Sequence, residues 1–293
     1  MITVPDDPRV GSSPALEFLS RAGRLHPFAI ILGALAVVAI GQGIVALPVQ
    51  AALGSSPVAT SFTAVSSFIG VWLALWLWMR FVDHRPLRDL GLVGRPRDLW
   101  IGVLIAVAIL GLDVVVMAAG GWADPAWAHP GAKGLGIILG TLILFAIQGP
   151  AEEIVLRGYL MQGVAARWGI PAGLGLQAVL FALLHGANPD MSWLAVLNIA
   201  LFGLLLGMLV LWRGSLWAAM GFHALWNWLQ GLVLGFDVSG MSFGTSLLAQ
   251  HPRAGAALWT GGSFGAEGSV LTTSFCTVAI VVVAVAWRRS TAR

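Results

Sequence analysis

Long apolar runs separated by short polar segments dominate the 293-residue chain. Several of these runs reach the ~20 residues that an α-helix needs to cross a hydrocarbon layer about 30 Å thick. The pattern predicts an all-α fold, a polytopic transmembrane bundle of about eight spans. The predicted spans are Pro27 to Gln50, Ala59 to Val82, Leu99 to Ala119, Gly134 to about Ala166, Ile170 to Ala187, Trp193 to Trp212, Leu216 to Phe236 and Ser269 to Trp287.

The fourth apolar run is too long for one straight crossing, because ~33 residues at 1.5 Å each span about 50 Å. Gly149 and Pro150 lie inside this run. A proline removes one helical hydrogen bond and its ring clashes with the preceding turn. We therefore expect the helix to break or bend at these two residues.

Basic residues indicate how the bundle is oriented. With eight spans, the arginines before the first span, between the second and third, and after the fourth, sixth and eighth all fall on one side, leaving mainly Lys133 and Arg253 on the other. The positive-inside bias then places both termini in the cytoplasm. Residues 1–26 become a polar cytoplasmic tail and 27–293 a single membrane-embedded domain. The Gly- and Ser-rich loop 236–268 lies on the opposite side, as a mobile cover or interfacial element.

The amino-acid composition narrows the class of protein further. Hydrophobic residues make up 58% of the chain and charged residues only 10%, against roughly 25% charged in a soluble domain. The net charge of +3 is small and its basic residues lie at span ends, so nucleic acid is not an expected partner. The single Cys276 excludes an internal disulfide framework and a cysteine-based zinc site. The bias toward Ala, Gly, Arg and Trp indicates a bacterial plasma membrane.

Two adjacent carboxylates, Glu152 and Glu153, stand out in this apolar sequence. An ionised carboxylate inside a bilayer costs at least about 3 kcal/mol and usually faces a cavity or a partner. Arg157 lies four residues after Glu153, on the same helix face, so these two should pair. Glu152 is rotated by about 100° and should face elsewhere, as a candidate general base. The alternative is a structural ion pair that locks two helices.

Other polar residues lie at similar depth. His223 and Asn227 are four residues apart and face the same way, which suits stabilisation of an oxyanion. His185 lies near the end of the fifth span. Taken singly, His185 is more often a structural hydrogen-bonding residue, and His223 with Asn227 also fits an ordinary hydrogen-bonded pair between helices. Counted from the basic helix ends, however, these three residues and Glu152 lie roughly 15 to 23 Å deep. We therefore expect them to meet at one site.

Three motifs in this order resemble the motif set of the CAAX protease and bacteriocin-processing (CPBP) family of intramembrane endopeptidases, which includes the type II CAAX prenyl proteases. They are Glu152-Glu153-x-x-x-Arg157, Phe181-x-x-x-His185 and His223-x-x-x-Asn227. The resemblance covers roughly residues 145–230, within a catalytic core of about 134–235. It implies that Glu152 and His185 activate a water. Glu153 and Arg157 would support the site electrostatically, and His223 and Asn227 would stabilise the oxyanion.

The resemblance thus implies an endopeptidase that hydrolyses a peptide bond in a membrane-bound or lipidated, CAAX-like protein or peptide. A zinc site made by Glu152, His185 and His223 is an alternative, in keeping with a metalloprotease-like chemistry. The lack of a His-Glu-x-x-His helix and the asparagine in the third motif favour catalysis without a metal or other cofactor. Two other classes stay open: a non-proteolytic membrane scaffold or immunity protein, and a proton-coupled transporter. The lack of an internal repeat counts against the transporter.

Overall fold

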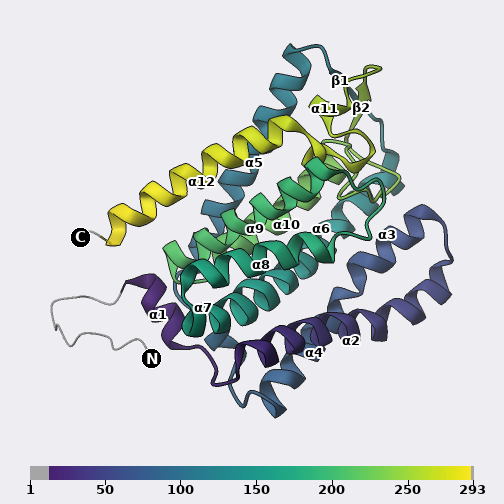
Figure 1. Ribbon diagram of the computed structural model, residues 1–293. Helices are drawn as coiled ribbons and strands as arrows, with labels where there is room; N and C mark the ends of the chain where they lie inside the picture. Colours follow the sequence, from purple (N-terminus) through teal and green to yellow (C-terminus); the bar gives the residue numbers. More distant parts are fainter. Residues whose placement is uncertain (1–12, 292–293) are drawn as a thin grey trace.

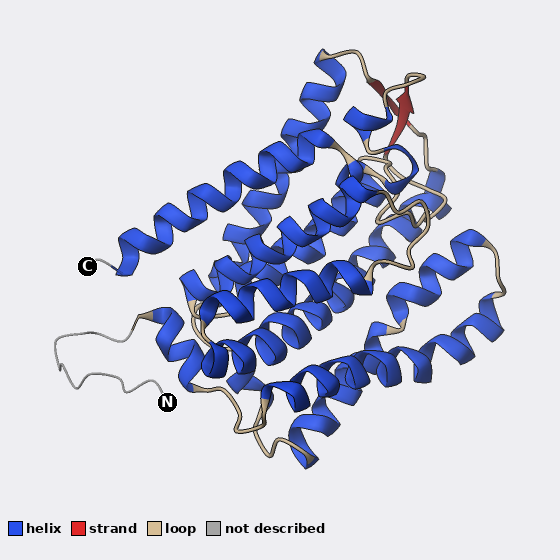
Figure 2. Ribbon diagram, in the orientation of Figure 1, coloured by secondary structure: helices blue, strands red, loops and turns tan. Residues whose placement is uncertain are grey.

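The computed structural model describes residues 13–291, so residues 1–12 of the predicted polar tail lie outside the described part. Long helices run between two ends of the molecule, with very little strand (Figures 1 and 2). The all-α polytopic prediction is confirmed. The helices are α1 (Pro14–Ser20), α2 (Pro27–Leu53), α3 (Pro57–Ser66), α4 (Phe68–Phe81), α5 (Leu99–Ala119), α6 (Gly131–Glu153), α7 (Gln162–Trp168), α8 (Ile170–Leu184), α9 (Trp193–Arg213), α10 (Trp217–Trp228), α11 (Ala257–Thr260) and α12 (Val270–Thr291).

The described chain also contains short helices of two other types. The 3₁₀ helices are η1 (Leu87–Leu90), η2 (Pro96–Asp98), η5 (Gly262–Phe264) and η6 (Ala266–Gly268). The π-helices are η3 (Ile154–Met161) and η4 (Leu229–Val233).

Six helical segments of the described chain are long and apolar enough to cross a membrane, against the eight predicted. They are Pro27–Leu53, Pro57–Phe81, Pro96–Ala119, Gly131–Trp168, Trp193–Arg213 and Val270–Ser290. The fifth and seventh predicted spans are shorter than expected. Helix α8 has 15 residues, which reach only about 22 Å. Helix α10 packs against α5, α6 and α9 inside the bundle, where protein rather than lipid sets its length.

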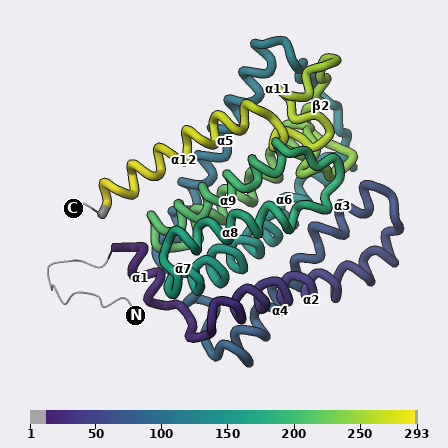
Figure 3. Tube along the Cα trace, viewed as in Figure 1, coloured from purple at the N-terminus to yellow at the C-terminus, as the bar shows by residue number. Residues whose placement is uncertain are grey.

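Because the long helices run back and forth between the two ends of the molecule, both ends of the described chain lie at the same end, as Figure 3 shows. Arginine side chains join the loops at this end. Arg167 donates a hydrogen bond to the carbonyl of Gly23 over 2.9 Å. Arg213 makes two bonds of 3.0 Å to Asp98. These contacts agree with the predicted gathering of basic residues, while their placement in the cytoplasm stays a prediction.

Of the predicted break or bend at Gly149 and Pro150, the break is wrong, while a bend stays a prediction. Helix α6 runs through both residues to Glu153, and the change of geometry comes afterwards, in the π-helix η3. A Cβ atom on Gly149 would lie 2.8 Å from the backbone nitrogen of Ala224 in α10. This close packing against α10 supports α6 where Pro150 removes a hydrogen bond. The two carboxylates therefore stand on a continuous helix.

The loop 236–268 contains regular structure that the sequence pattern did not predict. Strand β2 (Leu248–Pro252) pairs antiparallel with β1 (Ala123–Trp127), from Ala123 opposite Pro252 to Trp127 opposite Leu248. Next to this ladder the rings of Trp122 and Trp259 stack, with centroids 4.1 Å apart. We call residues 236–268 the roof, because they close the bundle at the end away from the two ends of the described chain.

Candidate active site

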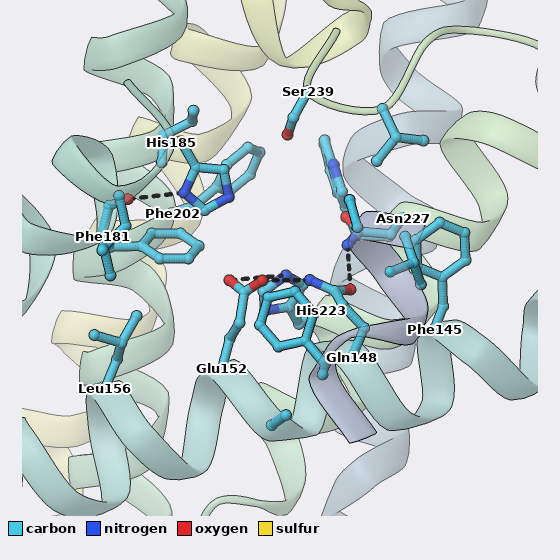
Figure 4. Close-up of a pocket in the computed structure, with 18 of the residues that line it drawn as sticks. Phe145, Gln148, Glu152, Leu156, Phe181, His185, Phe202, His223, Asn227 and Ser239 are labelled. Atoms are coloured by element: carbon cyan, nitrogen blue, oxygen red, sulfur yellow. Dashed lines mark hydrogen bonds and ion pairs between the residues drawn. The ribbon is translucent and has the colours of Figure 1, made fainter. Parts of the chain in front are cut away.

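A cavity of about 170 Å³ lies inside the bundle between α6, α8 and α10, beneath the roof (Figure 4). This volume is far above the about 10–15 Å³ that one water requires. Four of the six predicted site residues line the cavity, and Figure 4 shows their side chains converging on it. They are Glu152, His185, His223 and Asn227.

The other two predicted residues lie behind the cavity wall and form a buried network. Oε1 of Glu153 is 2.9 Å from a guanidinium nitrogen of Arg157, and both side chains are fully buried. The predicted pairing is thus confirmed. The same Oε1 is 2.7 Å from Nδ1 of His223. With Nδ1 bound to Glu153, Nε2 of His223 faces Glu152, 3.9 Å from its Oε2.

Glu152 faces the cavity and is held by an amide that sequence reasoning missed. Gln148, one turn earlier on α6, donates a hydrogen bond to Oε1 of Glu152. The oxygen of Gln148 in turn accepts a bond of 2.9 Å from Nδ2 of Asn227. The signal was present in the sequence, because Gln148 is a polar residue four positions before Glu152 on the same face of an apolar helix.

His185 projects into the cavity because α8 ends just before it. Its Nδ1 is 2.8 Å from the carbonyl oxygen of Phe181, and since a carbonyl only accepts, Nδ1 carries the proton. In the neutral form of this ring, Nε2 keeps a lone pair. The ring of Phe181 lies edge-on to both His185 and His223, with centroids 4.7 and 5.9 Å away. The guanidinium of Arg157 sits 4.3 Å from the same ring. Phe181 thus packs the imidazoles in place.

The roof contributes a third carboxylate, which sequence reasoning also missed. Glu267 is 4% exposed and lines the cavity. It accepts hydrogen bonds from Nε1 of Trp226, over 2.9 Å, and from the hydroxyl of Ser239, over 2.6 Å. Burial raises the pKa of the Glu267 carboxyl, opposed by the Ser239 hydrogen bond. A lone glutamate in a Gly-rich loop carries no motif, so nothing nearby in the sequence marks its partners.

The residues do not fit the alternative zinc site. Among the described residues no group of three His, Cys, Asp or Glu side chains is arranged to hold a metal ion. Zinc ligands lie about 2.0–2.2 Å from the metal, and Glu152, His185 and His223 do not form such a set. The metalloprotease-like description is not supported.

The fold and the site define a polytopic membrane protein with a polar, carboxylate-containing cavity in its interior. Residues 134–229 match the family model described as type II CAAX prenyl endopeptidase Rce1-like. The matched segment holds all three motifs, so the resemblance to the CAAX protease and bacteriocin-processing family is confirmed. Together with the six apolar helices, the match makes the chain an integral membrane protein, in agreement with the predicted plasma-membrane location.

One curated relative is similar over a longer stretch. Uncharacterized protein YyaK of Bacillus subtilis (strain 168) is 28% identical over 179 residues, which are 54% of this chain and 54% of the relative. The chain therefore spans about half the length of this curated relative. No solved structure matches the chain significantly.

Proposed function

We propose that the chain is an intramembrane endopeptidase that hydrolyses a peptide bond in a membrane-bound or lipidated protein or peptide. One observation carries the proposal: Glu152, His185, His223 and Asn227, from three different helices, line one cavity inside the bundle. Polar residues at membrane depth are costly unless they serve a cavity or a partner. The match of residues 134–229 to a prenyl endopeptidase family points to the same reaction.

The geometry suggests a division of roles. Glu152 accepts a proton from a water, and the lone pair on Nε2 of His185 helps to orient that water. The water oxygen bonds to the peptide carbonyl carbon and forms a tetrahedral oxyanion. When the carbon–nitrogen bond breaks, the proton on Glu152 passes to the leaving nitrogen. No other acceptor or donor of electrons is needed.

Two donors are placed to stabilise the oxyanion. Protonated His223 donates from Nε2, because Glu153 binds its Nδ1. Asn227 uses one amide hydrogen on Gln148 and keeps the second. Removing one donor from such a site typically lowers kcat by about 10²–10³-fold. Glu153 and Arg157 act through His223, by fixing its orientation and charge.

The remaining walls indicate an apolar substrate segment. On the side of α2, α3 and α4 the cavity is lined by Val38, Ala64, Val65 and Phe68, with the amide of Gln42 among them. An extended peptide bound here has its peptide bond near the polar residues and its neighbouring side chains on apolar walls. Exclusion of bulk water strengthens the electrostatic interactions with the reacting atoms.

The test is cleavage of a panel of membrane-tethered peptides, farnesylated CAAX peptides included, by the purified protein. Glu152→Gln and His185→Ala are each expected to lower the rate by about 10²–10⁴-fold, because each removes a group that handles the water or its proton. The matched control is Glu17→Gln, an exposed carboxylate on α1, which should keep the wild-type rate. Membrane fractionation checks that all variants insert.

Wild-type rates in both site variants would reject this mechanism. A strong zinc chelator added to the wild type is expected to leave cleavage unchanged, whereas loss of cleavage would require a metal. Proton flux into liposomes without any peptide cleavage would instead support the transporter alternative.

A further inference from the structure

The roof carboxylate Glu267 lies outside the segment that matches the family model and outside all three motifs. It nevertheless lines the same cavity as Glu152. Figure 4 shows Ser239, which binds Glu267, on the other side of the cavity from Glu152. The cavity is therefore bounded by a carboxylate on α6 and a second carboxylate from the chain after α10.

Three elements hold Glu267 in place. Its carboxylate accepts from Trp226 on α10 and from Ser239 in the roof. Its backbone carbonyl accepts a bond of 2.7 Å from Nδ2 of Asn198 on α9. Thr273 of α12 donates to the oxygen of that same asparagine over 2.6 Å. A buried side chain with this many fixed partners has a defined position rather than a range of rotamers.

The two side chains that Glu267 holds are next to the reacting groups. Trp226 directly precedes Asn227 and follows His223 by three residues, one helical turn. Ser239 donates its hydroxyl proton to Glu267, so its oxygen lone pairs are left to accept an N–H group of a bound peptide. The position of Glu267 thus determines where a substrate backbone can form a hydrogen bond on the roof side of the cavity.

We propose that Glu267 is a positioning residue for the proposed hydrolysis, which holds Ser239 and Trp226 over the reacting groups. This role rests on the proposed endopeptidase function. It assigns part of the site to the roof, which the family match does not include.

The test is the rate of cleavage by Glu267→Gln, which keeps the size of the side chain and one acceptor oxygen but replaces the second acceptor with an amide group that only donates. We expect kcat to fall about 10–100-fold with KM nearly unchanged. Glu267→Asp should restore part of kcat, since it restores both acceptor oxygens.

Asp113→Asn is the matched control, because Asp113 is a buried carboxylate that accepts from Thr272 over 2.7 Å and does not line the cavity. It should keep the wild-type kcat. An unchanged kcat in Glu267→Gln would overturn the role, and so would an equal loss of kcat in Glu267→Gln and Asp113→Asn. No cleavage by the wild type would reject the endopeptidase function itself, whereas wild-type cleavage with an unaffected Glu267→Gln rejects only this inference.

Discussion

Glu153, Arg157 and His223 show how one buried residue constrains the next. The ion pair between Glu153 and Arg157 is fully buried, and the desolvation of two charges offsets much of their attraction. The pair is therefore a poor source of net stability, yet neither partner can be removed alone without leaving an uncompensated charge. Its use lies in fixing His223, whose Nδ1 is 2.7 Å from the same carboxylate oxygen.

A double-mutant cycle tests this reasoning. Arg157→Met alone should destabilise the protein by about 3–5 kcal/mol, because it leaves Glu153 buried without its partner. Glu153→Gln combined with Arg157→Met should recover a large part of that loss, since neither charge of the ion pair then remains. Thermal unfolding in detergent measures both effects. A double variant less stable than Arg157→Met would contradict the account.

Glu267, which lies outside the membrane-spanning helices, gives a pH prediction. Burial raises the pKa of its carboxyl above the ordinary 4.5. A carboxyl with a raised pKa stabilises the fold while it is protonated, and this contribution is lost as the pH rises above 4.5 and through the raised pKa. Glu267→Gln cannot ionise, so its Tm should improve relative to wild type between about pH 5 and pH 8.

The matched control for this series is Asp124→Asn on β1, whose carboxylate is 65% exposed. Its Tm difference from wild type should stay flat over the same range. A flat difference for Glu267→Gln would show that the roof carboxylate is ionised in both the folded and unfolded states at these pH values.

At the scale of the elements, hydropathy located the helices well. The predicted third span, Leu99 to Ala119, coincides with α5. The four-residue spacing of Glu153 and Arg157 correctly predicted their pairing, because it depends only on helix geometry. The catalytic roles given to the six motif residues remain predictions, although the structure brings these residues together.

Other features depend on contacts between distant residues, which no local pattern reports. Continuity of α6 through Pro150 relies on packing against Ala224 of α10. The partners of Glu267 lie 28 and 41 residues away in the sequence. The ladder of β1 and β2 joins two loops that are far apart in the chain. Sequence reasoning could not anticipate these features without a tertiary structure.

The contact of α6 with α10 provides a prediction with an internal control. Gly149→Ala places a methyl group 2.8 Å from the backbone of Ala224, so the helices must separate. We expect a loss of about 1–3 kcal/mol and slower cleavage, because Glu152 moves relative to His223. Gly140→Ala on the same helix meets nothing within 4 Å and should gain up to about 1 kcal/mol from helix propensity.

Unfolding in detergent and the cleavage rate measure both substitutions. Equal effects of Gly149→Ala and Gly140→Ala would show that the close approach of α6 to α10 does not position the carboxylate.

At the scale of the whole molecule, arginine contacts tie one end together and the roof closes the other. The positive-inside bias predicts that the arginine end faces the cytoplasm. Cysteine labelling tests this cleanly, because the native Cys276 is buried. Asp124→Cys in β1 should react with an impermeant maleimide on intact cells. Arg88→Cys, at a side chain that is 77% exposed, should react only after lysis, and the reverse pattern would invert the topology.

The division of the cavity between chain segments has an evolutionary consequence. The groups proposed to break the peptide bond come from residues 134–229, whereas apolar walls come from α2 to α4 and the upper surface from the roof. Selection can therefore alter these outer segments, and with them the preferred substrate, while the chemical machinery stays the same. Relatives that share the three motifs can differ in the substrates they cleave while catalysing the same reaction. A chimera that exchanges only the outer segments between two such relatives should carry the donor's selectivity with it.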